Sequence, residues 1–201
     1  MNQTGKLTNI VLHYLNENVN YALLRNYEGL PFNNDSRDID IVIEKKELHR
    51  HQTAILNIII ESGWKIVNHL NNGRLITFVC GIIHNDKVEL LQWDFFLHTS
   101  VYGVALIEAK EMLEEREFNG DLYHVSKTYE FLDKYVYNRV VGEQYPLKYQ
   151  SIRDEVGKSE QVKIKLKKLF DNENIEVIDS ISKKKLLKKV LLKNLKTQFF
   201  R

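Results

Sequence analysis

Apolar residues recur along the chain with two different spacings, and the change from one spacing to the other predicts its elements. Over residues 6–19 they return at helical intervals, whereas residues 20–26 and 37–43 have the apolar, extended character of strands. The segment between the two strands contains Gly29, Pro31 and small polar residues, which is typical of a loop. We therefore expect a helix followed by two strands.

The same pattern continues along the chain and predicts a mixed sheet with helices on it. The expected elements are a helix at 44–63, strands at 64–68, 74–80 and 87–97, a helix at 102–116, a short strand at 121–125, a helix at 126–141, and two or more helices at 150–200 with a break near 171–174. This order predicts an α+β fold: a mixed β-sheet with flanking helices, followed by a helical C-terminal region. We expect an α/β domain over residues 1–125 and a helical region over residues 126–201.

Composition excludes several classes of protein. The chain has 201 residues, of which 43% are hydrophobic, and this is enough apolar material for a core. The single cysteine, Cys80, cannot form an internal disulfide, and its apolar neighbours predict a buried core position. The N-terminus lacks the pattern of a signal peptide, and no apolar run reaches the length of a membrane span. We therefore expect a cytoplasmic protein.

Two acidic residues stand on the second predicted strand. Side chains alternate between the two faces of a strand, so Asp38 and Asp40 point to the same side, away from the apolar residues that alternate with them. Two neighbouring carboxylates repel each other, and a divalent cation such as Mg²⁺, which prefers oxygen ligands, relieves that repulsion. The alternative is an exposed edge strand that carries two solvated acids.

A third acid lies in the predicted strand at 87–97. Asp94 is a charge within an apolar run, and a charged side chain in that position needs a partner when it is buried. It is therefore a candidate third metal ligand beside Asp38 and Asp40. The alternative is that Asp94 marks the end of its strand and caps a loop.

These segments together resemble the polymerase-beta-type nucleotidyltransferase superfamily, and most closely the small nucleotidyltransferase-like proteins of bacterial sugar-polymer gene clusters. The resemblance covers roughly the first half of the chain, at residues 21–26, 36–42 and 88–96. It implies that Asp38, Asp40 and Asp94 are catalytic and hold two Mg²⁺ ions, and that the third acid helps to deprotonate the acceptor hydroxyl. The implied substrates are a nucleoside triphosphate and a small acceptor.

One position departs from the pattern of the family. Where the family has a Gly-Ser pair that grips the triphosphate, this chain has Arg25 and Asn26. Arg25 could bind phosphate through its planar guanidinium group, and Asn26 could donate a hydrogen bond. With Ser36 and Arg37 of the second motif, these residues form the nucleotide-binding set that the resemblance implies. Alternatively the triphosphate grip is lost, and the protein binds something else or is inactive.

The C-terminal end of the chain is basic. The whole chain has a net charge of +2, but residues 158–201 hold 13 Lys and Arg against 5 Asp and Glu. Residues 183–196 predict a basic amphipathic helix with leucines every four residues. Such a helix packs on its own domain with its lysines in water, or meets an anionic membrane surface or an acidic partner. Because aromatic residues are not interleaved with the lysines, we expect no dedicated nucleic-acid site.

Three functions are consistent with these patterns. The leading hypothesis is an enzyme that transfers a nucleotidyl group, with Mg²⁺, from a nucleoside triphosphate to the hydroxyl or phosphate of a small acceptor such as a sugar or polysaccharide precursor. The second is a non-catalytic relative, either a binding module or part of a toxin–antitoxin pair. The third is a glycosyltransferase whose Asp-x-Asp motif holds a metal, but only 37 residues precede Asp38, too few for the usual nucleotide-binding half.

Overall fold

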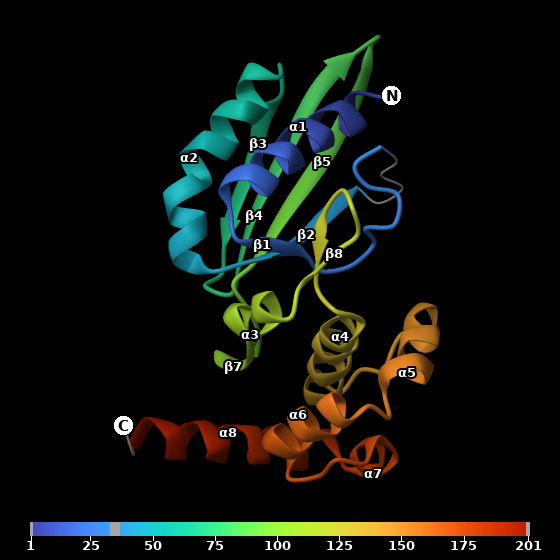
Figure 1. Ribbon diagram of the computed structural model, residues 1–201. Helices are drawn as coiled ribbons and strands as arrows, with labels where there is room; N and C mark the ends of the chain where they lie inside the picture. The colour runs from blue at the N-terminus through green and yellow to red at the C-terminus, as the bar shows by residue number, and fades with distance from the viewer. Residues whose placement is uncertain (1, 33–36, 200–201) are drawn as a thin grey trace. The chain divides into compact units, whose positions relative to one another are not determined.

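Residues 21–124 supply a seven-stranded mixed sheet in the computed structural model, which describes residues 2–32 and 37–199 (Figure 1). Its elements are α1 (Gln3–Asn18), β1 (Tyr21–Leu23), β2 (Asp38–Ile43), α2 (Lys45–Glu61), β3 (Lys65–Asn71), β4 (Leu75–His84), β5 (Lys87–Phe96), α3 (Ala109–Glu114), β8 (Glu117–Phe118) and β9 (Tyr123–His124). The strand order is β3-β4-β5-β2-β1-β9-β8, with β2 parallel to β5 and β1 parallel to β9. The predicted α+β fold with a mixed sheet is confirmed.

The chain divides into two compact units. The first, called here the sheet unit, comprises Met1–His98 and Glu108–Val125. The second, called the helical unit, comprises Thr99–Ile107 and Ser126–Arg201. A small two-stranded sheet of β6 (His98–Val101) and β7 (Val104–Glu108) lies mainly in the helical unit, so that unit contains a segment from the middle of the chain.

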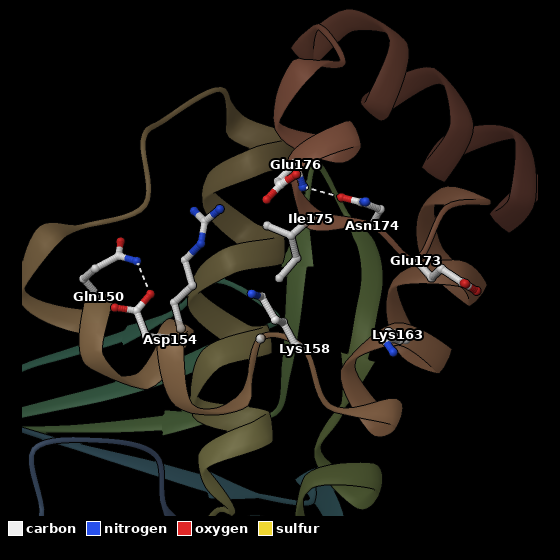
Figure 2. A pocket seen from close by; sticks show the side chains of 10 residues that line it. Gln150, Asp154, Lys158, Lys163, Glu173, Asn174, Ile175 and Glu176 are labelled. Atoms are coloured by element: carbon white, nitrogen blue, oxygen red, sulfur yellow. Dashed lines mark hydrogen bonds between the residues drawn. The ribbon is translucent and has the colours of Figure 1, made fainter.

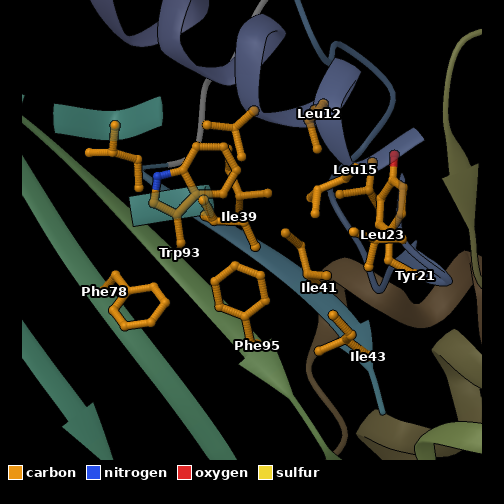
Figure 3. Packing of buried hydrophobic residues seen from close by; sticks show 14 of the residues in the cluster. Leu12, Leu15, Tyr21, Leu23, Ile39, Ile41, Ile43, Phe78, Trp93 and Phe95 are labelled. Carbon is orange, nitrogen blue, oxygen red and sulfur yellow. The ribbon is translucent and has the colours of Figure 1, made fainter. Parts of the chain in front are cut away.

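The core of the sheet unit lies on the face of the sheet that α1 and α2 cover. The apolar residues of β2, Ile39, Ile41 and Ile43, are buried there, beside Trp93 and Phe95 of β5 (Figure 3). Parallel pairing places Ile39 opposite Trp93 and Ile41 opposite Phe95, so the two strands present their apolar positions to the same side. The remaining positions of β2 and β5 therefore face the other side of the sheet.

Short turns join the long strands at the predicted places. Residues 72–74 connect β3 to β4, and residues 85–86 connect β4 to β5, so each connection overlaps the turn predicted at 71–73 or at 84–86. At the second turn Asn85 and Asp86 have φ angles of 50° and 58°. Two successive residues with positive φ form the turn that best matches the twist of a β-hairpin, and Asn and Asp tolerate this conformation better than other non-glycine residues. The turn thus fixes which residues of β4 and β5 face each other.

The prediction of a helix over residues 102–116 is wrong for the first half of this segment. This segment contains the strand β7 and only then the short helix α3. Tyr102 and Gly103 have φ angles of 50° and 78°, so they form a tight turn that folds β7 back onto β6. The apolar residues after the turn fit helical and strand spacing alike over so short a distance, and pairing with β6 decides between them.

The helical unit consists of α4 (Lys127–Val141), a 3₁₀ turn (Leu147–Tyr149), α5 (Gln150–Val156), α6 (Glu160–Phe170), α7 (Ile175–Ser180) and α8 (Lys183–Phe199). The predicted break near 171–174 is confirmed. Asp171 ends α6 in the left-handed conformation with φ 53°, and the Asn174 side chain caps α7 by accepting hydrogen bonds from two backbone N–H groups. Within the described residues, no helix combines the length and the apolar character that crossing a membrane requires.

Candidate metal centre

Three carboxylates converge on the face of the sheet opposite the core. Asp38 and Asp40 come from β2 and Asp94 comes from β5, and one oxygen of each lies within 4.8 Å of the others. The parallel register explains this geometry, because Asp40 stands directly opposite Asp94 and Asp38 stands opposite Gln92. Alternation along β2 adds Asp38 to the same side. The three acids predicted from the sequence therefore form one cluster.

Asp40 is the most strongly perturbed member of the cluster. Its side chain is 5% exposed, and that of Asp94 is 7% exposed, whereas Asp38 is exposed. Burial, and to a smaller extent the negative charges of Asp38 and Asp94, raise the pKa of Asp40 to about 6, although the nearby Arg25 guanidinium acts to lower it. Even with Arg25 beside it, the charged form of Asp40 is therefore less favourable in the metal-free folded protein than in water.

Asp94 is held by two donors that the sequence analysis did not identify. The Thr77 hydroxyl on β4 donates to Oδ1 of Asp94 at 2.5 Å, and the Gln92 side-chain amide donates to Oδ2 at 2.8 Å. Gln92 precedes Asp94 by two residues, so strand alternation alone could have placed it on the same face. Thr77 could be found only from the register of the β4–β5 hairpin, in which it stands opposite Asp94. Together they fix the orientation of the Asp94 carboxylate.

Replacement of Thr77 by Val should weaken divalent-metal binding about 10–100-fold, because groups that orient a ligand usually contribute that much to metal affinity. Valine keeps the shape of threonine but removes the hydroxyl that holds Asp94. Isothermal titration with Mn²⁺ or Mg²⁺ measures the change, and Thr77→Ser, which retains a hydroxyl, serves as the control. Equal metal affinities of wild type and Thr77→Val would show that the hydroxyl plays no part in the site.

Arg25 lies beside the acid cluster and pairs with it. Its Nε donates to Oδ2 of Asp40 at 2.5 Å, and its guanidinium carbon lies 5.3 Å from the centre of the Phe96 ring. Only 11% of the Arg25 side chain is exposed. The residue aligned with the first motif of the superfamily therefore reaches the site through Asp40. A phosphate-binding role for Arg25 stays a prediction.

The other residues predicted to bind nucleotide stand at different places. Asn26 is exposed and has a φ angle of 55°, a left-handed conformation that asparagine adopts more readily than most residues. Arg37 has an exposed side chain, and its carbonyl accepts a hydrogen bond from the backbone N–H of Gln92 at 2.9 Å. Ser36 lies outside the described residues. Nucleotide binding by all three stays a prediction.

The sheet face that carries the acids is buried on one side of them and exposed on the other. Toward the C-terminal end of β2 the next residue on this face, Val42, is completely buried. Toward the tip of the β4–β5 hairpin the same face carries Leu90, Val88 and Ile83, which are 46%, 68% and 76% exposed. A ligand bound at the acids would therefore have no room beside Val42, but it could contact the exposed apolar side chains toward the tip of the hairpin.

Two surface pockets in the described residues are separate from the acid cluster. The larger, of about 900 Å³, lies in the helical unit, where Gln150 bonds to Asp154 and Asn174 caps the backbone at Glu176 (Figure 2). A second, of about 680 Å³, lies in the sheet unit near Glu44 and Glu108. Both pockets are lined by acidic and basic side chains together, whereas the acid cluster contains only negatively charged side chains.

Comparison of the chain with protein-family models, curated proteins and solved structures finds no match. The resemblance to nucleotidyltransferases therefore rests on the motifs at residues 21–26, 36–42 and 88–96.

Proposed function

We propose that the sheet unit is a metal-dependent nucleotidyltransferase that transfers a nucleotidyl group from a nucleoside triphosphate to a small acceptor hydroxyl or phosphate. One observation carries the proposal: Asp38, Asp40 and Asp94 meet on one face of two parallel strands, with ligand atoms within 4.8 Å. The resemblance to the superfamily, which uses three acids in this way, supports the same chemistry. A sugar or polysaccharide precursor is the acceptor that the resemblance favours.

The donor set fits a hard divalent cation. All three groups are carboxylates, which are the side chains that Mg²⁺ prefers, and a carboxylate oxygen can accept more than one contact. The hydrogen bonds from Thr77 and Gln92 to Asp94 therefore leave lone pairs on both of its oxygens for a metal. Bound Mg²⁺ would neutralise the triphosphate and stabilise the charge that develops during in-line attack on the α-phosphorus.

The protein residues have separate parts in this proposal. All three acids would hold the metals, Asp38 and Asp40 would also orient the triphosphate through them, and Asp94 would in addition accept the proton of the acceptor hydroxyl. Thr77 and Gln92 keep the Asp94 carboxylate turned toward the other two acids. Because Asp94 is 7% exposed, little water competes for its oxygens, which strengthens its interaction with a cation.

Release of pyrophosphate tests the proposed reaction. Wild-type protein should release pyrophosphate from a nucleoside triphosphate in the presence of Mg²⁺ and a suitable sugar or sugar-phosphate acceptor, and chelation with EDTA should stop the release. Asp94→Asn should lower the rate at least about a thousandfold, because it removes both a metal ligand and the proposed base. No metal-dependent release from wild type over all common triphosphates and a broad acceptor panel would contradict the proposal.

A second candidate function is binding without turnover, in a non-catalytic relative such as a toxin–antitoxin module. The ion pair between Arg25 and Asp40 favours it, because a built-in guanidinium group already neutralises one of the three acids. A thermal-shift screen of nucleotides and nucleotide-sugars, with and without Mg²⁺, separates the candidates. Nucleotide-dependent stabilisation without pyrophosphate release would support the binding module, and a response confined to nucleotide-sugars would point to a glycosyltransferase.

A further inference from the structure

The C-terminal helix α8 presents two faces of different chemistry. Lys184, Lys188, Leu191 and Leu195 recur at intervals of four, three and four residues, so they share one side of the helix. All four are exposed. Lys185 and Leu192, which are seven residues apart, flank this line and are also exposed, Leu192 at 47%. One side of α8 therefore carries lysines in its first half and leucines in its second half, and we call it the outer face.

The opposite side of α8 is fixed within the helical unit. Leu186 is completely buried and Val190 is 5% exposed, and α8 packs against α4 and α6. Lys189 donates to the carbonyl of Phe170 at 2.8 Å, and Lys193 donates to the carbonyl of Lys168 at 2.7 Å. These contacts set the rotation of the helix about its axis. The outer face is therefore turned away from the unit's own core.

The outer face is both basic and apolar. Among the described residues, no acidic side chain pairs with Lys184, Lys185 or Lys188. Leu191 and Leu195 are 37% and 50% exposed, and with Leu192 they form a contiguous apolar stripe beside these lysines. In Figure 1 the second half of α8 runs on beyond α6 and α7. A helix face that carries both exposed leucines and lysines fits a partner with negative charges at its surface and an apolar layer directly beneath them.

We propose that the outer face of α8 docks on an anionic membrane surface. Leu191, Leu192 and Leu195 enter the boundary between headgroups and acyl chains, and Lys184, Lys185 and Lys188 contact the lipid phosphates. Residues 158–201 hold 13 basic and 5 acidic residues, and their net positive charge adds a long-range attraction to the negative surface. A nucleic acid would use the lysines but would gain little from the leucines, and residues 184–195 contain no aromatic side chain for base stacking.

Co-sedimentation with lipid vesicles tests the proposal. The full chain should bind vesicles of phosphatidylcholine with about 30 mol % phosphatidylglycerol and should bind pure phosphatidylcholine vesicles far more weakly. Binding should fall steeply between about 0.05 M and about 0.5 M salt, because exposed charges are screened. The triple variant Lys184→Gln, Lys185→Gln, Lys188→Gln should bind the anionic vesicles about a hundredfold more weakly, since each lysine contributes roughly fivefold.

A matched triple variant controls for net charge. Lys45→Gln, Lys65→Gln, Lys87→Gln removes the same charge from exposed positions of the sheet unit and should leave vesicle binding within about twofold of wild type. Circular dichroism melting confirms that each variant folds, which the exposure of the replaced side chains favours.

The leucines decide between a membrane and a soluble polyanion. Leu191→Ser, Leu195→Ser should weaken binding to anionic vesicles at least about tenfold while it leaves binding to heparin unchanged. Absence of vesicle binding by folded wild-type protein at low salt would overturn the proposal, and so would vesicle binding that survives both the lysine and the leucine variants. Because these measurements need no nucleotide or metal, their outcome is independent of the proposed transferase activity.

Discussion

Asp40→Asn is expected to abolish turnover while it leaves the fold as stable as before or more stable. Asparagine keeps the shape of the side chain but removes a negative charge from the acid cluster. In a metal-dependent transferase the ions that neutralise the phosphoryl group would then be lost or misplaced, and turnover should fall at least about a thousandfold. Pyrophosphate release measures this loss, and thermal melting of the metal-free protein measures the stability.

The stability gain follows from the pKa of Asp40. Its folded value of about 6 lies above its ordinary value of 3.8, so the folded state holds a proton more tightly than the unfolded state. Lowering the pH from above 6 toward 4 therefore increases the contribution of Asp40 to the stability of the metal-free wild type, by an amount on the order of 1–3 kcal/mol. Asparagine is uncharged at every pH, so the variant avoids the cost of a buried negative charge at position 40 throughout the pH range. Asp40→Asn should accordingly melt higher than wild type at about pH 8 and lose the rise on acidification.

Asp86→Asn is the control for a lost negative charge, because Asp86 is exposed at the β4–β5 turn and asparagine accepts its backbone conformation. It should retain activity and the pH dependence of wild type. A clear fall in the melting temperature of Asp40→Asn would mean that Asp40 supports the fold through Arg25. Unchanged pyrophosphate release by Asp40→Asn would remove Asp40 from the proposed metal site.

Arg25→Ala is expected to destabilise the metal-free protein and to enlarge its response to Mg²⁺. Arg25 is the cation that faces Asp40 at 2.5 Å, so its removal leaves a buried carboxylate without that partner. The expected cost at about pH 8 is roughly 1–3 kcal/mol, below the full cost of a broken buried pair because Asp40 can take up a proton. Added Mg²⁺ should restore more of the lost stability than it adds to wild type, since a cation then replaces the guanidinium group.

Arg37→Ala provides the matched control for this experiment. Arg37 is an exposed arginine next to Asp38, and its backbone carbonyl, which the substitution keeps, accepts the hydrogen bond from the Gln92 N–H. Replacement of its side chain should therefore leave the metal-free melting temperature unchanged. A loss of all response to Mg²⁺ in Arg25→Ala would mean that Arg25 holds Asp40 in position for the metal. A loss of nucleotide affinity at saturating Mg²⁺ would instead support direct phosphate binding by Arg25.

Local sequence determined the elements whose pattern is long or whose turns are strongly marked. The alternation Asp38-Ile39-Asp40-Ile41 places both acids on one face of any strand, whatever that strand pairs with. The polar turns at 71–73 and 84–86 and the helix break at 171–174 were also predictable, because these residues favour turn and cap conformations by themselves. Over residues 102–116 the pattern was ambiguous, and the hairpin turn at Tyr102 and Gly103 overrode the predicted helix.

Tertiary structure alone decided what surrounds the first two acids. Asp94 is 54 residues away from Asp40, and only the parallel, in-register pairing of β5 with β2 brings the two carboxylates together. Hairpin register likewise placed Thr77 on Asp94, and the turn of the chain after β1 placed Arg25 on Asp40. Spacing along one strand follows from backbone geometry, whereas contact between strands depends on which of many pairings buries the most apolar surface.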